Sequence, residues 1–314
     1  MNRSFKPALV TTSLIAAAFL TACGGGGNDA PLPDKAVSVS FAIVNGTTPV
    51  KCGTQLTGMG TTGLAADVKD LRFYITNLAL INDKGVAVPV KLDTNKWQST
   101  QGAETVSLID LEDATGTCAT AANTAETNAV ITGTVAGGTY VGLKATVGVP
   151  ETMNHTAVAG GIAPLDSAAM NWSWQSGRKF TKIELNPVGG LAKPDGTSIA
   201  TYNLHLGSTG CTPKLDAAGV AIPNSGTCTN LNMADFSLAA FDVSTQKVAL
   251  DIGQLFKTSN LTQENGGAPG CMSGATDPEC AVIFTELQVS FGSGSNGKPI
   301  NGGAAQKIFK AIAK

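Results

Sequence analysis

Charged residues and histidines are scarce in this sequence. Of its 314 residues, 14% are charged, and 21 Lys and Arg against 23 Asp and Glu give a formal net charge of −2. Nucleic-acid binding through a basic face needs clustered Lys and Arg to neutralise phosphates, so this balance excludes that class of protein. The chain has two histidines, His155 and His205, and any chemistry that depends on imidazole is confined to these positions.

The motifs of common catalytic and redox sites are also missing. The sequence contains no G-x-S-x-G nucleophile elbow and no P-loop. No two cysteines form a C-x-x-C, which argues against a zinc ribbon or a thioredoxin-like site. Asp110, Glu112 and Asp113 cluster at a predicted strand end, where they are either solvated or form a weak calcium site. We predict that the protein is not an enzyme.

Apolar residues alternate with small or polar residues along many short segments, and glycine-rich and asparagine-rich turns separate these segments. A period of two is typical of β-strands. Helical periodicity is limited to a turn at 252–256 and an amphipathic segment at 304–313. The sequence predicts an all-β protein with a single antiparallel β-sandwich or barrel-like domain and long disulfide-stapled loops. The predicted strands cover residues 37–43, 70–81, 86–92, 106–111, 129–135, 140–149, 180–185, 199–206, 235–243, 247–252 and 282–289.

The N-terminus predicts export and a lipid anchor. Arg3 and Lys6 precede an apolar run over residues 8–20, which is too short to span a bilayer and suits a signal peptide. The run leads into Leu-Thr-Ala-Cys, ending at Cys23, which resembles the lipobox of bacterial lipoproteins. An ordinary signal peptide with a chance cysteine is the alternative. Gly24, rather than Asp, after the cysteine favours an outer-membrane lipoprotein on the periplasmic or cell-surface side.

These signals divide the chain into three parts. Residues 1–22 are the predicted lipoprotein signal peptide. Residues 23–36 hold the lipidated cysteine and a flexible tether that is rich in Gly and Pro. Residues 37–314 form the predicted β domain, within which no composition break marks a further boundary.

The six cysteines after the lipobox predict disulfides, because an even number of cysteines in an exported chain is typical of a disulfide framework. Two pairs enclose short loops rich in Gly, Pro, Thr and Asn, and the remaining two cysteines pair by elimination. The predicted disulfides are Cys211–Cys228, Cys271–Cys280 and Cys52–Cys118.

Soft-ligand and aromatic residues lie close to the histidines in the sequence. Met153 stands two residues before His155, Trp172 and Trp174 follow, and His205 lies in a predicted strand just before a glycine-containing turn. Imidazole and thioether ligands select copper over calcium or magnesium, which favours a copper site. The alternative is that the histidines and tryptophans are packed core residues.

Five segments carry a resemblance to a known family. In order along the chain, they resemble the MbnP-like family, the metallo-mystery pair system four-Cys motif proteins associated with methanobactin operons. The chain departs from the family pattern at Arg178, where an aromatic residue is expected, and we expect this change to affect partner docking or surface packing. The segments are DLRFYITNLALI (70–81), VGVPETMNH (147–155), MNWSWQSGRKF (170–180), HLGSTGC (205–211) and GCMSGATDPEC (270–280).

The resemblance implies an exported copper-binding β protein with a di-haem, cytochrome-c-peroxidase-like (MauG-like) partner. That partner oxidises a Trp of this protein to kynurenine, which together with histidines forms or tunes the copper site. Carried over by motif, the candidate metal residues are His155, His205 and Trp174 or Trp172, and the modified residue is one of these two tryptophans. Trp97 lies outside the motifs and is expected to stay unmodified.

Two functions from other classes stay open. One is a structural or adhesive β-sandwich lipoprotein without a metal role, whose histidines are packed. The other is a carbohydrate-binding module or hydrolase in which Trp172 and Trp174 stack on a sugar. A neighbouring gene for a di-haem c-type cytochrome would separate the copper function from both.

Overall fold

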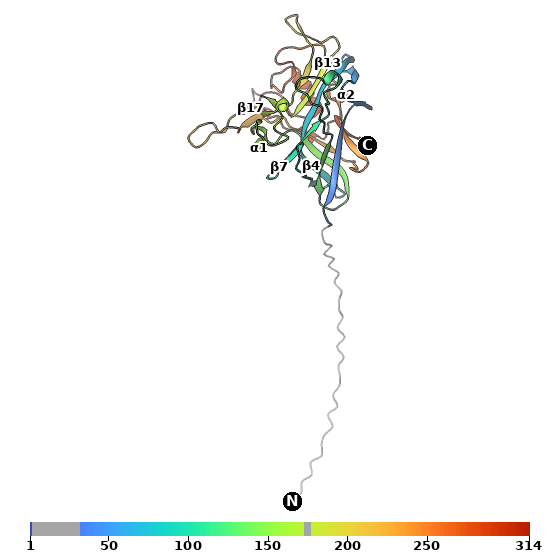
Figure 1. The fold of residues 1–314 in the computed structure, drawn as a ribbon, viewed down its shortest axis with the longest axis vertical. Helices are drawn as coiled ribbons and strands as arrows, with labels where there is room; N and C mark the ends of the chain where they lie inside the picture. The colour runs from blue at the N-terminus through green and yellow to red at the C-terminus, as the bar shows by residue number, and fades with distance from the viewer. Residues whose placement is uncertain (2–31, 173–176) are drawn as a thin grey trace. The chain divides into compact units, whose positions relative to one another are not determined.

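Strand β4 (Leu64–Asn82) is the longest element in the computed structural model, which describes residues 1, 32–172 and 177–314. Its two halves pair with different neighbours, so that β4 joins five other strands directly. The resulting ten-stranded sheet has the main order β19-β10-β4-β13-β16-β21. Figure 1 labels β4 and β13 of this sheet. Its remaining strands are β3 (Gln55–Met59), β5 (Ala87–Pro89), β7 (Gln98–Gln101), β8 (Glu104–Asp110), β10 (Tyr140–Val147), β13 (Thr181–Pro187), β16 (Tyr202–Leu204), β19 (Ala234–Leu238) and β21 (Gly270–Cys271).

A second sheet of six strands is built around β1 (Lys35–Asn45), which begins two residues before the predicted start of the domain. Along β1 the residues alternate between exposed and buried, as a strand with one covered face requires. The main order is β22-β20-β1-β9-β6, with β2 also paired to β1. The other strands are β2 (Thr48–Val50), β6 (Lys91–Leu92), β9 (Val130–Val135), β20 (Gln246–Asp251) and β22 (Phe309–Ala313).

The hydrophobic core joins the two sheets. Phe41 of β1 meets Phe73 of β4 edge to face, with ring centroids 6.1 Å apart. Phe309 of β22 packs against the same Phe73 and stacks on Phe236 of β19 at 4.0 Å. Burying a Phe side chain contributes roughly 1.5–3 kcal/mol, and aromatic pairs add to this. These contacts confirm the predicted all-β sandwich.

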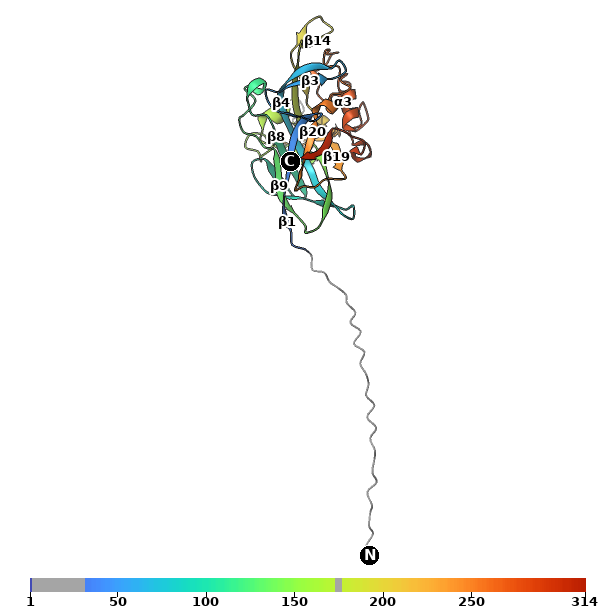
Figure 2. The same cartoon turned by 90° about the vertical axis from the view of Figure 1, so that its right-hand side faces the viewer.

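Three local predictions were wrong. The pairs β1–β20 and β16–β21 are parallel, so the sheets are not purely antiparallel. Residues 282–289, predicted as a strand, lie largely in helix α3 (Cys280–Leu287), because their buried residues recur at helical spacing. The predicted C-terminal helix at 304–313 contains strand β22 instead, because this segment pairs with β20 and forms the edge of the six-stranded sheet. Figure 2 shows α3 on the side of the sheets opposite β8.

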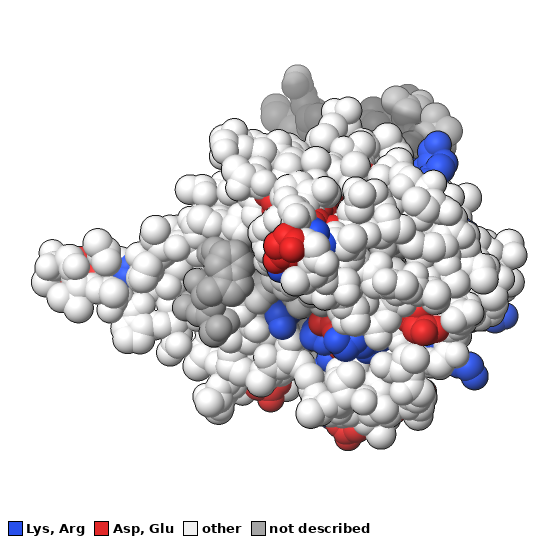
Figure 3. Space-filling model, turned by 90° about the horizontal axis from the view of Figure 1, so that it is seen from above, with Lys and Arg blue, Asp and Glu red and all other residues white. Residues whose placement is uncertain are grey.

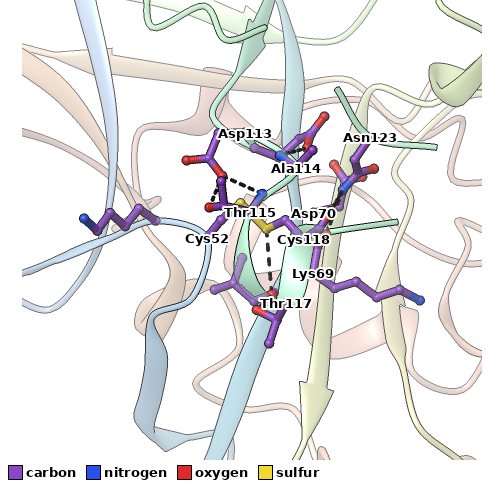
Figure 4. Close-up of a disulfide and its surroundings, with 12 residues drawn as sticks. Cys52, Lys69, Asp70, Asp113, Ala114, Thr115, Thr117, Cys118 and Asn123 are labelled. Carbon is purple, nitrogen blue, oxygen red and sulfur yellow. Dashed lines mark hydrogen bonds between the residues drawn. A yellow bond between two sulfur atoms is a disulfide. The ribbon is translucent and has the colours of Figure 1, made fainter. Parts of the chain in front are cut away.

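Three disulfides join the six cysteines in the pairs inferred from spacing and elimination. Cys52–Cys118 links segments 66 residues apart, and Figure 4 shows it beside β4, where the hydroxyl of Thr117 donates to the carbonyl oxygen of Val68. Cys271–Cys280 ties β21 to the start of α3. Bridges of this kind typically contribute about 2–4 kcal/mol by restricting the unfolded chain.

The third disulfide, Cys211–Cys228, joins directly opposed residues of the hairpin β17 (Thr209–Thr212) and β18 (Thr227–Asn230). Beyond it, the loop 213–226 extends away from the sheets and is mostly exposed (Figure 1). Seen from above, this projection is largely free of charge (Figure 3). The remaining short strands and α-helices are β11 (Asn171–Trp172), β12 (Gly177–Arg178), β14 (Leu191–Ala192), β15 (Ser198–Ile199), α1 (Glu151–Asn154) and α2 (Ile252–Leu255). Three 3-10 helices cover Gly116–Cys118, Ala168–Met170 and Ile300–Gly303.

The predicted anchor residue, Cys23, lies outside the described residues, as does Trp174. Among the residues that are described, none of the helices is long and apolar enough to cross a membrane.

Candidate metal centre

His155 lies at the end of a one-turn helix that directly follows strand β10. Pro150 precedes the first helical residue, and its carbonyl oxygen accepts the backbone N–H groups of Met153 and Asn154. His155 is the residue that ends the turn. The imidazole is buried, with 5% of the residue exposed. Its position is therefore set by the helical turn and by the segments that pack on it, and not by a mobile surface loop.

The imidazole of His155 lies against the base of the β17–β18 hairpin. Its Nε2 is 3.2 Å from Sγ of Cys228 and 3.3 Å from Nδ2 of Asn154. A side chain at Gly226 would come within 2.9 Å of the ring, so this position accommodates only glycine without rearrangement. His155, Cys211 and Cys228 place possible ligand atoms within 4.8 Å of one another. While the disulfide is closed, its sulfurs are not thiolates, and His155 is the strong metal ligand of this group.

A cavity of about 320 Å³ opens beside His155. Residues of the projecting loop, including Pro213 and Ile222, line one side, and Thr156 and Asn171 line the other. The imidazole of His155 is therefore buried, but it borders a cavity that a small solute can enter.

His205 follows strand β16 and is held by a carboxylate. Its Nε2–H donates to Oε1 of Glu184 at 2.9 Å, and only 6% of the residue is exposed. Nδ1 is buried, and no group among the described residues hydrogen-bonds to it. Burial lowers the pKa of His205 despite the hydrogen bond to Glu184, so the imidazole is neutral. A histidine that binds a metal is usually neutral: one ring nitrogen is the ligand, and the other donates a hydrogen bond, often to a carboxylate.

The carboxylate of Glu184 is itself kept ionised by its surroundings. Burial raises its pKa, but the hydrogen bond from His205 and the charge of Lys182 outweigh this and lower the pKa to about 2. Lys182 Nζ lies 3.0 Å from Oε1 of Glu184 and also bonds to Asp70, which pairs with Arg72. A buried chain of alternating charges thus fixes the orientation of His205.

The short hairpin β11–β12 lies between the two histidine-bearing segments. Trp172 of β11 is buried, and a side chain at Gly207 would come within 2.5 Å of its ring, so the indole packs on the segment just after His205. On β12, the backbone N–H of Arg178 donates to Oδ1 of Asn154, the neighbour of His155. The hairpin therefore contacts both segments, and residues 173–176 lie outside the described residues.

Arg178 and Met153, both named in the sequence analysis, lie in the interior of the domain. Arg178 is not a surface residue: 1% of it is exposed, and its guanidinium donates to carbonyl oxygens of Leu165, Asn154 and Thr156. It therefore holds the loop around His155 from inside the domain. Met153 is fully buried in the hydrophobic core. Sequence patterns missed Arg178 and Glu184 as positioning residues, because their partners are backbone carbonyls and a histidine distant in the chain.

The acidic group of Asp110, Glu112 and Asp113 had two interpretations, a solvated strand end and a weak calcium site. The structure does not show a solvated strand end. Asp110 and Glu112 are buried beside Arg72, whose Nη1 lies 3.6 Å from Glu112. Burial raises the pKa of Asp110 to about 7 against the attraction of Arg72. Asp113 instead accepts hydrogen bonds from Thr115 in a local turn. The guanidinium of Arg72 thus supplies positive charge beside the first two carboxylates.

The fold and the site define a disulfide-bonded, all-β protein with a candidate metal centre at its histidines. The family model for MbnP matches residues 34–273. Among solved structures, MbnP from Methylosinus trichosporium is similar at 35% sequence identity and a TM-score of 0.78, over 90% of this chain and 99% of that chain. None of the curated proteins matches the chain. The chain belongs to the MbnP family, which is associated with methanobactin and copper handling.

Proposed function

We propose that this protein is an exported copper-binding protein that holds one copper ion through His155 and His205. The observation that carries the proposal is the buried Nδ1 of His205, which has no hydrogen-bond partner among the described residues while Glu184 holds Nε2. A buried polar atom left unpaired is costly, and a metal ion satisfies it. Imidazole nitrogen suits copper, and the buried carboxylate behind it raises the basicity of the ligand.

The test of the copper site is a titration of the purified mature protein with Cu(I) and Cu(II) under competition with a chelator. The proposal expects one copper per chain, and it expects stoichiometric binding to be lost when His155→Ala is combined with His205→Ala. Circular dichroism of the double variant checks that the fold is intact. Unchanged copper stoichiometry in a folded double variant would show that the histidines are not the ligands.

The second part of the proposal is that Trp172 or Trp174 is a substrate for oxidation to kynurenine by a di-haem, peroxidase-like partner. In this reaction, two molecules of hydrogen peroxide supply two oxygen atoms to the indole, cleave its C2–C3 bond and leave as water. Hydrolysis of the formyl group then releases formate and the aniline nitrogen. Support comes from the position of Trp172, which packs on the segment after His205.

Trp172 is 4% exposed, so a protein partner cannot touch its ring directly, and electrons would leave it through the intervening protein. Mass spectrometry of protein co-expressed with the partner locates the modification. Trp97, whose ring lies 5.1 Å from the ammonium group of Lys96, is the internal control and is expected to stay intact. An unmodified 172–174 peptide in the presence of an active partner would reject this part of the proposal.

The third part is the location. We propose that Cys23 carries a lipid and anchors the protein to the outer membrane, in an accessory role and not as an enzyme. The three disulfides fit an oxidising compartment outside the cytoplasm. N-terminal mass spectrometry after expression in a bacterium tests the anchor, since a diacylated Cys23 is expected at the mature N-terminus. A mature N-terminus beyond Cys23 would contradict it.

A further inference from the structure

The Cys211–Cys228 disulfide lies directly against an imidazole nitrogen. Nε2 of His155 is 3.2 Å from Sγ of Cys228, and the ligand atoms of the histidine and the two cysteines all lie within 4.8 Å of one another. The two sulfurs are close in any disulfide, but the bridge does not require the contact with the imidazole. Metal–nitrogen and metal–sulfur bonds are about 2.0–2.3 Å long, so one ion can bridge the nitrogen and the sulfur.

The hydrogen bonds of Asn154 show which form of Nε2 faces the sulfur. Oδ1 of Asn154 accepts the backbone N–H of Arg178 at 2.8 Å, which fixes the orientation of the amide. Nδ2 of Asn154 then faces Nε2 of His155 at 3.3 Å, and because an amide nitrogen only donates, Nε2 is the acceptor. The ring nitrogen beside Cys228 therefore carries a lone pair, as a metal ligand must.

The fold holds the two cysteines in place independently of the bridge. Cys211 and Cys228 are directly opposed in the antiparallel pair of β17 and β18, and the Cβ atoms of opposed residues lie about 4.5–5.5 Å apart. The backbone N–H of Cys228 also donates to Oε1 of Glu151 at 3.0 Å, which ties β18 to the helical turn that His155 ends. Reduction of the bridge would therefore leave two thiols beside the imidazole.

A reductant and a metal ion both have a route to this group. Cys211 and Cys228 are partly exposed, whereas the other four cysteines are buried. The cavity of about 320 Å³ beside His155 is lined in part by Pro213 and Ile222, which belong to the loop between the two cysteines. A mild reductant can therefore open this bridge while the two buried disulfides stay closed.

Reduction changes the ligands that the group offers. A dithiol reductant transfers two electrons and two protons to the Cys211–Cys228 bond: the S–S bond of the protein breaks, and the reductant closes to its own disulfide. Binding of Cu(I) then displaces the two thiol protons. Thiolate and imidazole ligands select soft ions such as Cu(I), whereas a structural Zn²⁺ site takes a fourth protein ligand.

We propose that His155, Cys211 and Cys228 form a Cu(I) site with one nitrogen and two sulfur ligands once the bridge is reduced. In the oxidised protein, the same imidazole belongs to the proposed copper centre with His205. The redox state of the bridge thus selects between two sets of copper ligands. The thiolate site does not rest on the proposed function, because it needs neither His205 nor a modified tryptophan.

The experiment opens the bridge with a dithiol, removes the dithiol, and titrates the mature protein with Cu(I) in competition with a chelator and without oxygen. Alkylation and peptide mapping verify beforehand that only Cys211 and Cys228 are reduced. A thiolate-to-copper charge-transfer absorption that saturates at one Cu(I) per chain is expected. The bound ion should also protect both cysteines from alkylation.

Three variants separate the contributions of the ligands. His155→Ala should weaken Cu(I) binding by the reduced protein about ten-fold or more, because even the partners of a ligand contribute this much. Cys211→Ser combined with Cys228→Ser keeps both histidines and should show no charge-transfer absorption. Thr227→Ala, at an exposed position of the same hairpin, is the matched control and should bind Cu(I) as the reduced wild type does.

A reduced wild-type protein that lacks the charge-transfer absorption would overturn the proposal, whether or not the hairpin stays folded. So would equal Cu(I) affinity of the reduced wild type and His155→Ala. If His155→Ala does not fold, the NMR chemical shift of Nε2 in the reduced wild type decides, and a shift that Cu(I) leaves unchanged would refute the site. Failure of the oxidised protein to bind copper, in contrast, refutes only the His155–His205 centre, because the sulfurs are closed there.

Discussion

Arg178 donates its backbone N–H to Oδ1 of Asn154 at 2.8 Å and its guanidinium to the carbonyl oxygen of the same residue at 2.9 Å. The two residues thus join the tryptophan-bearing hairpin to the turn that carries His155. An aromatic residue at position 178 could not make the guanidinium contacts. The orientation of His155 in this chain therefore depends on a buried cation from another part of the fold.

Replacing that cation should destabilise the protein strongly. Arg178→Met removes donors from several buried carbonyl oxygens, and we expect a loss of about 3 kcal/mol in the free energy of unfolding. Urea denaturation followed by fluorescence measures the change. Lys257→Met, at an exposed position, is the control and should shift stability by less than about 0.5 kcal/mol. Equal stability of Arg178→Met and wild type would show that the carbonyls find other donors.

The carboxylate behind His205 should tune copper affinity without being a ligand. Glu184→Gln preserves the shape of the side chain but removes the negative charge that accepts the Nε2–H of His205. We therefore expect copper to bind about 10–100-fold more weakly, at unchanged stoichiometry. Competition with a copper chelator measures this. Glu126→Gln removes an exposed carboxylate paired with Lys96 and should leave the affinity as it is. If both variants behave alike, Glu184 does not support the site.

Asp110 gives a pH dependence of stability with a defined sign. Burial raises its pKa from 3.8 to about 7, so in this window the folded chain keeps a proton that the unfolded chain has released. The contribution of Asp110 to stability is therefore present at low pH and is lost as the pH rises to about 7. Asp110→Asn imitates the protonated form, and its stability relative to wild type should rise by about 4 kcal/mol between low pH and pH 7.

Chemical denaturation of wild type and Asp110→Asn at a series of pH values measures that difference. Asp93→Asn, at an exposed position, should follow the wild-type curve. A difference between Asp110→Asn and wild type that does not change with pH would contradict the raised pKa.

The close contact between Gly207 and Trp172 leaves no room for a methyl group. In Gly207→Ala, the new Cβ would lie 2.5 Å from the indole and 2.8 Å from the carbonyl oxygen of Arg178. We expect a loss of about 1–3 kcal/mol and a shifted tryptophan emission spectrum, as overpacking displaces the ring. Gly138→Ala is the matched control, because its nearest neighbour atoms are 3.8 Å away. An unshifted spectrum would show that the ring has space to move.

The three disulfides should differ in the rate at which they are reduced. Cys211 and Cys228 are partly exposed, whereas the other four cysteines are buried. A mild reductant should therefore open Cys211–Cys228 first, and alkylation followed by peptide mapping identifies the labelled residues. Labelling of Cys271 or Cys280 before Cys228 would contradict this order.

The sequence was informative where one local pattern decides the structure. Alternating residues predicted β1, β4 and β10, and loop length with elimination predicted the cysteine pairs. It failed at α3, where an apolar run suits a helix as well as a strand, and at β22, where an open strand edge decided the conformation. Spacing also pointed to both histidines, but the partners of His205 come from strand pairing between β13 and β16, which no local signal encodes.

The hairpin that covers His155 is closed at its base by the Cys211–Cys228 bridge, beyond which lies the exposed loop 213–226. Exposed loop tips are the preferred targets of proteases. A single cut within this loop divides the chain into two fragments, and the bridge keeps these fragments covalently joined. The base of the hairpin that covers His155 therefore stays closed after a nick in the loop.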